Sequence, residues 1–159
     1  MSRAFVKEDS DAPPPPIPER PISTAQNFVT PRGARLIAGT IAQLKARLVS
    51  ASAPDVDVIR RDLRYWLSRR ASMQLVPRVE APVVVGFGSC VAIQRGAVDS
   101  VVTIVGEDEA DPSSGLIAWT APLARALAGA QVGDTVELEA AGRREPIVVA
   151  GVTAGNSMP

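Results

Sequence analysis

The sequence predicts an α+β protein in which a helical hairpin precedes a small antiparallel β-sheet domain with one short helix. Two patterns support this prediction. Apolar residues recur at spacings of three and four from about residue 31 to residue 73, with one break near Pro54, as on the buried faces of two helices. Beyond Val83 the pattern changes to short β-branched runs separated by turn residues, which is typical of strands.

The first helix is expected to begin at Pro31 and to end near Val49. Thr30 can cap the free N–H groups of the first turn, and proline at the first helical position loses no hydrogen bond. Gly33 and Gly39 should weaken this helix by about 1 kcal/mol each relative to alanine. Its apolar face carries Ile37, Ile41, Leu44 and Leu48.

The second helix follows a short connection at residues 51–54. Ser52 and Asp55 resemble a capping box in which aspartate replaces the usual glutamate or glutamine. Two arms of about 20 residues would form an antiparallel hairpin about 30 Å long, which Pro77 should end. The apolar face of the second arm carries Val56, Ile59, Leu63, Trp66 and Met73.

The second half of the chain is expected to fold as a sheet domain of about 70 residues, small enough to be only marginally stable alone. Docking of the hairpin should therefore stabilise it. Residues 122–128 are the one helix expected there, and Gly129 is its expected C-cap. The predicted strands are residues 89–94, 100–105, 116–119, 135–140 and 146–152.

The two ends of the chain differ from these segments. Residues 1–28 include the run Pro13 to Pro16 and few apolar residues, so they should form a disordered, proline-rich tail. The predicted organisation is this tail, a hairpin at 29–78, the sheet domain at 79–153 and a frayed tail at 154–159.

The net charge of zero conceals a segregation of charge along the chain. Residues 31–78 hold 10 basic and 3 acidic side chains, whereas residues 79–159 hold 4 basic and 10 acidic ones. Such segregation indicates a polyanion beside the basic segment and a basic partner beside the acidic one, although solvated helices also tolerate arginine well. The basic side chains predicted to face RNA are Lys45, Arg47, Arg60, Arg61 and Arg64.

Composition argues against several classes of site. The chain has no histidine and one cysteine, Cys90, which argues against a structural zinc site, an internal disulfide and histidine-based catalysis. No apolar run reaches the length of a membrane span, and the first residues have no signal-peptide core. We therefore expect a cytoplasmic protein with no membrane association, no metal of its own and no catalytic residues.

The most unusual stretch is an acidic run between two predicted strands. Four like charges in five positions repel one another, so the fold alone would not favour them. Without a histidine or an evident nucleophile nearby, docking of a basic partner is a better interpretation than catalysis, and Pro122 and Leu123 would add an apolar contact beside it. The four carboxylates are Glu107, Asp108, Glu109 and Asp111.

Several motifs, taken in this order, resemble the GreA/GreB family of bacterial transcription elongation factors. The resemblance covers residues 29–152 and is densest in the second half. The matching segments are TPRG at 30–33, VGFG at 85–88, IVGEDEAD at 104–111, PLARALAG at 122–129 and VGD at 132–134.

The resemblance implies an architecture and a partner. The hairpin would be a coiled coil that enters the secondary channel of bacterial RNA polymerase, and the FKBP-like second domain would hold the rim of that channel. The protein would be a monomer that contacts nascent RNA. It would not itself be an enzyme, but at most would stimulate RNA hydrolysis by the polymerase, through Mg²⁺ shared with the polymerase active site.

The hairpin tip departs from the family pattern. Members that stimulate cleavage carry D-x-x-E-N there, and no such motif occurs between Thr30 and Pro77. The arms are also shorter by several turns. Asp55 and Asp57 are the only carboxylates at the tip; they do not share a helix face, and Asp55 is explained more simply as a first-turn residue.

Three alternative functions remain open from the sequence. The shortened hairpin resembles Rnk, the regulator of nucleoside diphosphate kinase in the same superfamily, which would compete for the secondary channel without promoting cleavage. A prolyl isomerase would need an aromatic pocket, for which this domain offers only Phe87 and Trp119. A stand-alone nucleic-acid-binding hairpin would bind RNA with a steep salt dependence.

Overall fold

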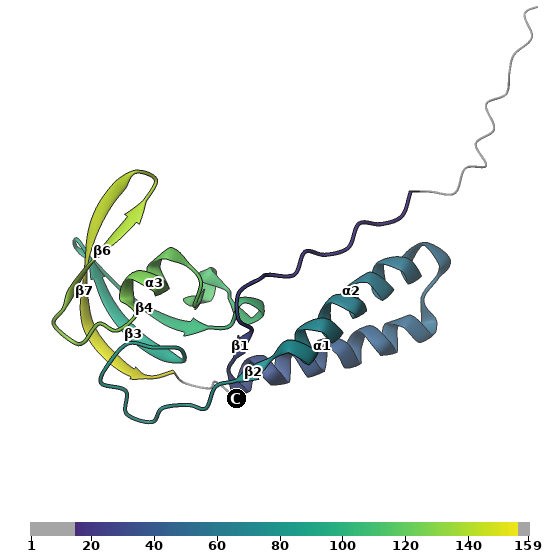
Figure 1. Ribbon diagram of the computed structural model, residues 1–159, viewed down its shortest axis with the longest axis horizontal. Helices are drawn as coiled ribbons and strands as arrows, with labels where there is room; N and C mark the ends of the chain where they lie inside the picture. Colours follow the sequence, from purple (N-terminus) through teal and green to yellow (C-terminus); the bar gives the residue numbers. More distant parts are fainter. Residues whose placement is uncertain (1–14, 156–159) are drawn as a thin grey trace, which may run out of the picture.

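The computed structural model describes residues 15–155 and has two parts, a helical hairpin and a sheet domain, which lie end to end (Figure 1). The hairpin consists of α1, Pro31–Ser50, and α2, Ala53–Ser72. Each helix has 20 residues, so each arm is about 30 Å long. Neither helix, nor any other in the described part of the chain, is long and apolar enough to span a membrane.

The two predicted apolar stripes face each other in the hairpin, except that Met73 is exposed and follows the last residue of α2. Ile37, Ile41 and Ile59 are buried, and Trp66 of α2 packs against the cluster that contains Ile37 and Ile41. The start of α1 is also as predicted, since the Thr30 hydroxyl accepts a hydrogen bond from the backbone N–H of Gly33.

The predicted capping box at the start of α2 is wrong. The Ser52 side chain makes no capping hydrogen bond and instead donates to the Asp55 carboxylate at 3.2 Å. Aspartate is one methylene shorter than the glutamate of the usual motif, and here its carboxylate is engaged by the side chain of Ser52.

The base of the hairpin is closed by a short parallel pair of strands that the sequence did not predict. β1, Phe28–Val29, pairs with β2, Gln74–Leu75. The side chain of the buried Asn27 donates to the Arg69 carbonyl at 2.7 Å and to Ser72 Oγ at 3.1 Å. Residues 27 and 28 therefore belong to the hairpin base and not to a disordered tail, while residues 1–14 of that tail lie outside the described residues.

The second part of the chain is a five-stranded sheet with the strand order β5-β4-β3-β7-β6 (Figure 1). The strands lie close to the predicted ranges. They are β3, Ser89–Arg95; β4, Val98–Val105; β5, Leu116–Ala118; β6, Thr135–Ala140; and β7, Arg143–Ala154. β7 includes Ala154, which we had expected to fray, whereas residues 156–159 lie outside the described range.

The sheet is mixed, and the prediction of a purely antiparallel sheet is wrong at one edge. β5 runs parallel to β4, with Leu116 beside Thr103. The loop between β4 and β5 contains two short 3₁₀ turns, Glu107–Glu109 and Pro112–Ser114. It brings the chain back beside Thr103 of β4, so that β5 can run in the same direction as β4. A loop of this length can make such a return, which a tight hairpin cannot.

The core of this domain lies between the sheet and α3, Pro122–Leu127. Leu127, Val91 and Ile147 are fully buried. The core is built almost entirely from aliphatic residues, as the low aromatic content indicates. The helix ends at Leu127 and its C-cap is Ala128, one residue before the predicted cap, while Gly129 follows in the left-handed region with φ +81°.

Candidate functional site

The acidic run lies where the two domains meet, and a glycine allows this close approach. Gly106 follows β4, and a Cβ atom added to it would lie 2.5 Å from the carbonyl oxygen of Phe28 in β1. A side chain at this position would clash with backbone, so only glycine lets the loop pass this close. The 3₁₀ turn Glu107–Glu109 then directs its carboxylates toward the hairpin base.

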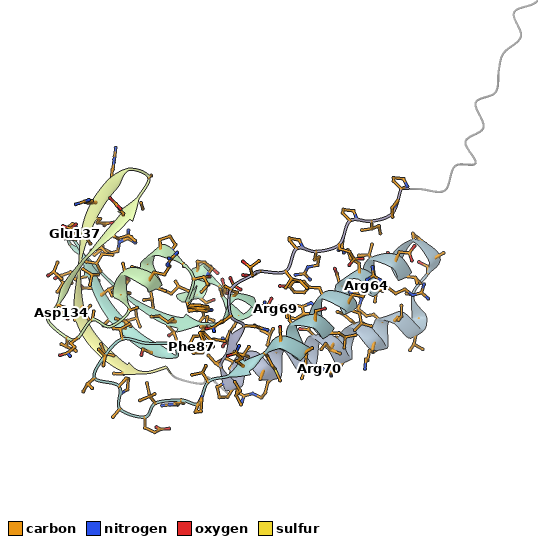
Figure 2. The ribbon with its side chains drawn as sticks, viewed as in Figure 1. Arg64, Arg69, Arg70, Phe87, Asp134 and Glu137 are labelled. Atoms are coloured by element: carbon orange, nitrogen blue, oxygen red, sulfur yellow. The ribbon has the colours of Figure 1, made fainter. Side chains whose placement is uncertain are left out.

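Asp108 pairs with a buried arginine on α2. Arg69 is only 2% exposed; its Nε donates to one oxygen of Asp108, and its Nη2 lies 3.5 Å from Glu107. The Tyr65 hydroxyl donates to the other Asp108 oxygen at 2.5 Å. Figure 2 shows Arg69 at the end of α2 nearest the sheet domain, with Arg64 farther toward the tip. Arg69 therefore differs from Arg60, Arg64 and Arg70, which are exposed on the same helix, because Arg69 is part of the junction.

Glu109 binds the first turn of α1. Its side chain is 3% exposed, and it accepts hydrogen bonds from Thr30 Oγ1 at 2.5 Å and Arg32 Nη1 at 3.2 Å. A Cβ at Gly33 would lie 2.8 Å from the Glu109 carboxylate. Gly33 thus weakens the helix, as the sequence indicates, but it also leaves room for the Glu109 carboxylate.

Glu107 joins three segments at the edge of the junction. One carboxylate oxygen accepts from Ser23 Oγ at 3.0 Å and from Thr120 Oγ1 at 3.1 Å, and the other faces Arg69. Donors from both domains therefore surround the three neighbouring carboxylates. Hydrogen bonds and opposite charges offset the repulsion that made the run conspicuous in the sequence.

An aromatic cluster closes the same junction. The Phe28 ring lies between Phe87, at a centroid distance of 5.8 Å, and Trp119, at 5.0 Å. Trp119 thus packs at the junction of the two domains. The two aromatic residues that a prolyl isomerase pocket would use here pack against the hairpin base instead.

The structure separates the predicted partner-binding residues into two groups. Glu107, Asp108 and Glu109 have partners inside the chain, as described above. Asp111 and Pro122 are exposed, and Leu123 is half-buried against the core. Hydrogen bonds from Ser113 and Ser114 hold the Asp111 carboxylate and lower its pKa, so Asp111 remains charged and accessible.

The predicted RNA-facing residues all lie on the hairpin, but they differ in what they contact. Lys45 and Arg47 are exposed on α1. On α2, Arg61 contacts its neighbour Asp62 at 2.8 Å, and Arg64 pairs with Glu19 from the N-terminal segment. Arg60 is exposed and lies 3.9 Å from Asp57.

The tip carboxylates do not form a shared site. Asp55 accepts the hydrogen bond from Ser52, and Asp57 lies beside Arg60. No group of three or more potential ligands suited to a metal ion occurs between residues 15 and 155.

The Tyr65–Asp108 hydrogen bond can be tested directly because Tyr65 is the only tyrosine in the chain. Partial burial, followed by the hydrogen bond to Asp108, raises the pKa of Tyr65 from 10.0 to about 12. We expect an ultraviolet titration of the folded protein to show phenolate formation near pH 12, against about 10 in denaturant. Since the folded state holds this proton more tightly, its contribution to stability is complete below pH 10 and is lost between pH 10 and 12.

An Asp108→Asn variant tests the assigned cause of this shift. It removes the negative charge beside the phenol, so the midpoint of the folded protein should move down toward 10. A midpoint unaffected by this substitution would contradict the contact between Tyr65 and Asp108.

Comparison with known proteins places the second domain in a family. Residues 80–153 match the family described as "Transcription elongation factor, GreA/GreB, C-term". Transcription elongation factor GreA of Xylella fastidiosa strain M12 is 46% identical over 78 residues, covering 47% of this chain and 49% of the relative. GreB of Neisseria meningitidis serogroup A is 38% identical over 97 residues, covering 59% and 60%.

These matches are partial. The matched part of the chain spans about half the length of the Xylella GreA and three fifths of the Neisseria GreB. A solved GreA/GreB structure from Nitrosomonas europaea is 23% identical, covering 81% of this chain and 98% of that one, with a TM-score of 0.40. The family assignment therefore rests on the sequence match over residues 80–153.

Proposed function

We propose that this chain regulates transcription elongation by binding RNA polymerase, because residues 80–153 match the C-terminal domain of the GreA/GreB family. One observation carries this proposal: the helical hairpin is fastened directly to the family domain by Arg69, Asp108 and Glu109. This junction gives the hairpin a defined direction. The domain would hold the rim of the secondary channel while the hairpin enters it.

We assign the polymerase contact to the exposed part of the predicted surface, Asp111 together with Pro122. The other three carboxylates would act indirectly, by setting the hairpin direction. In the channel, Arg60, Arg61 and Arg64 would face nascent RNA, whose phosphates favour guanidinium groups.

The hairpin tip supports a factor that occupies the channel without promoting cleavage. Cleavage would need carboxylates that converge on Mg²⁺ in the polymerase active site, whereas Asp55 and Asp57 each contact a residue of their own helix end. Their separation by two positions and the short arms support the Rnk-like alternative over a cleavage factor.

Charge reversal at Asp111 tests the assigned surface. We expect Asp111→Lys to weaken binding to core RNA polymerase about tenfold, because a like charge then faces the basic rim. Binding would be measured by co-purification and titration, with Glu139→Lys as a control for the change in net charge. Equal binding of wild type and Asp111→Lys would rule out this surface.

A further inference from the structure

The segment before β1 follows α2 for most of its length (Figure 1). Near the junction, Ser23 donates to Glu107, and at the other end Pro16 and Ile17 line a hollow together with Ala53 and Pro54 of the hairpin tip. We call residues 17–23 the strap. Its charged contacts with α2 come from two consecutive residues, Glu19 and Arg20, which lie over Arg64 and Tyr65.

The first contact is a forked ion pair. Arg64 Nε lies 3.1 and 3.3 Å from the two carboxylate oxygens of Glu19, and its Nη2 also donates to this carboxylate. This is the planar arrangement in which arginine also binds phosphate. Glu19 therefore occupies the donor groups of Arg64 that an RNA phosphate would use.

The second contact covers an aromatic ring. The Arg20 guanidinium carbon lies 3.9 Å from the centroid of Tyr65 and 5.7 Å from that of Trp66, and its Nη1 is 3.9 Å from Asp62. A cation in this position occupies the ring face on which a base could stack. The strap thus covers both a phosphate-binding group and the adjacent stacking surface.

These contacts are suited to exchange. The side chains of Glu19 and Arg64 are 60% and 57% exposed, and exposed pairs are weak and screened by salt. The strap also buries no large apolar side chain, since Ile17 is only half-buried and Ile22 is exposed. A chain of several phosphates can therefore displace a single carboxylate.

We propose that residues 17–23 form an autoinhibitory strap that competes with single-stranded RNA for the Arg64–Tyr65 face of α2. Forked arginine donors beside an aromatic ring match a phosphate next to a base, and Arg60 and Arg61 add charge on the same helix. The inference rests on the RNA-facing role of the hairpin proposed above.

Binding of a labelled single-stranded RNA of about 15 nucleotides to the protein at about 50 mM salt tests this competition. We expect Glu19→Gln to bind about two- to fivefold more tightly than wild type, since it releases Arg64. Glu139→Gln is the matched control: it removes one charge and one exposed pair, with Arg144, far from α2 on β6. It should leave the affinity nearly unchanged.

The indole N–H signal of Trp66 reports the strap without relying on affinity. The chemical shift of this signal should change in Glu19→Gln, and RNA should change it in the same direction in the wild type. The indole N–H signal of Trp119, at the junction, should not change in either case. The strap proposal would be overturned if Glu19→Gln and wild type bound RNA with equal affinity, or if Glu139→Gln gained as much affinity as Glu19→Gln. Either result would leave the proposed function of the protein untouched.

Two other results separate the strap from the proposed function. If neither wild type nor Glu19→Gln binds RNA, the RNA-facing role fails and the competition fails with it. If Glu19→Gln instead binds core polymerase more tightly with no gain for RNA, the covered face belongs to a protein partner and the competition with RNA is refuted.

Discussion

Replacing Arg69 with alanine is expected to lower the free energy of unfolding by about 3–5 kcal/mol. The substitution removes a guanidinium group that is 2% exposed and leaves Asp108, itself 11% exposed, without its cationic partner. Removing one partner of a buried ion pair costs this much because the remaining charge is desolvated and uncompensated. Denaturant unfolding measured by circular dichroism would give the value.

The neighbouring residue provides the control. Arg70 is exposed on the same turn of α2, so Arg70→Ala should change stability by about 0.5 kcal/mol or less. Arg69→Lys should fall between the two, because lysine keeps the charge but cannot contact Asp108 and Glu107 in one plane. Equal stability of Arg69→Ala and Arg70→Ala would show that the junction does not depend on this pair.

The second large effect is expected at Gly106. Gly106→Ala places a methyl group 2.5 Å from the Phe28 carbonyl oxygen, a contact that only a backbone shift can relieve. We expect a loss of about 1–3 kcal/mol, the usual cost of inserting a methyl group into a packed site. The shift should also move β1 away from the acidic loop and weaken the junction.

Gly86→Ala is the matched control, since its added Cβ would meet nothing within 4 Å. Melting temperatures of the two variants can be compared directly. A Gly106→Ala protein as stable as Gly86→Ala would mean that the loop does not approach β1 as closely as described.

The helices were predictable because their signals are local. Thr30, Pro31 and the spacing of Ile37 and Ile41 determine where α1 begins and which face it buries, with no information from distant residues. The parallel direction of β5 was not predictable. It depends on the path of the ten-residue loop between β4 and β5, and the periodicity of a strand is the same whether it runs parallel or antiparallel to its neighbour.

The site was predictable in position but not in role. The acidic run was conspicuous, yet a count of like charges cannot show that Arg69 and Thr30 lie opposite Asp108 and Glu109. Arg69 itself has no sequence signal that distinguishes it from Arg70. The strap could not be predicted because its proline-rich composition is typical of disorder. Its charged contacts come from Glu19 and Arg20, whose partners on α2 lie more than 40 positions away in the sequence.

The proposed role, occupation of the polymerase secondary channel without promotion of cleavage, can be tested by RNA cleavage in backtracked complexes. These complexes would contain a fixed amount of GreA and increasing amounts of this protein. We predict that GreA-stimulated cleavage falls as this protein takes its place. Cleavage that stays constant would show that the two do not share a site, and cleavage that rises, and is lost in Asp55→Ala/Asp57→Ala, would show that the tip delivers metal-binding carboxylates after all.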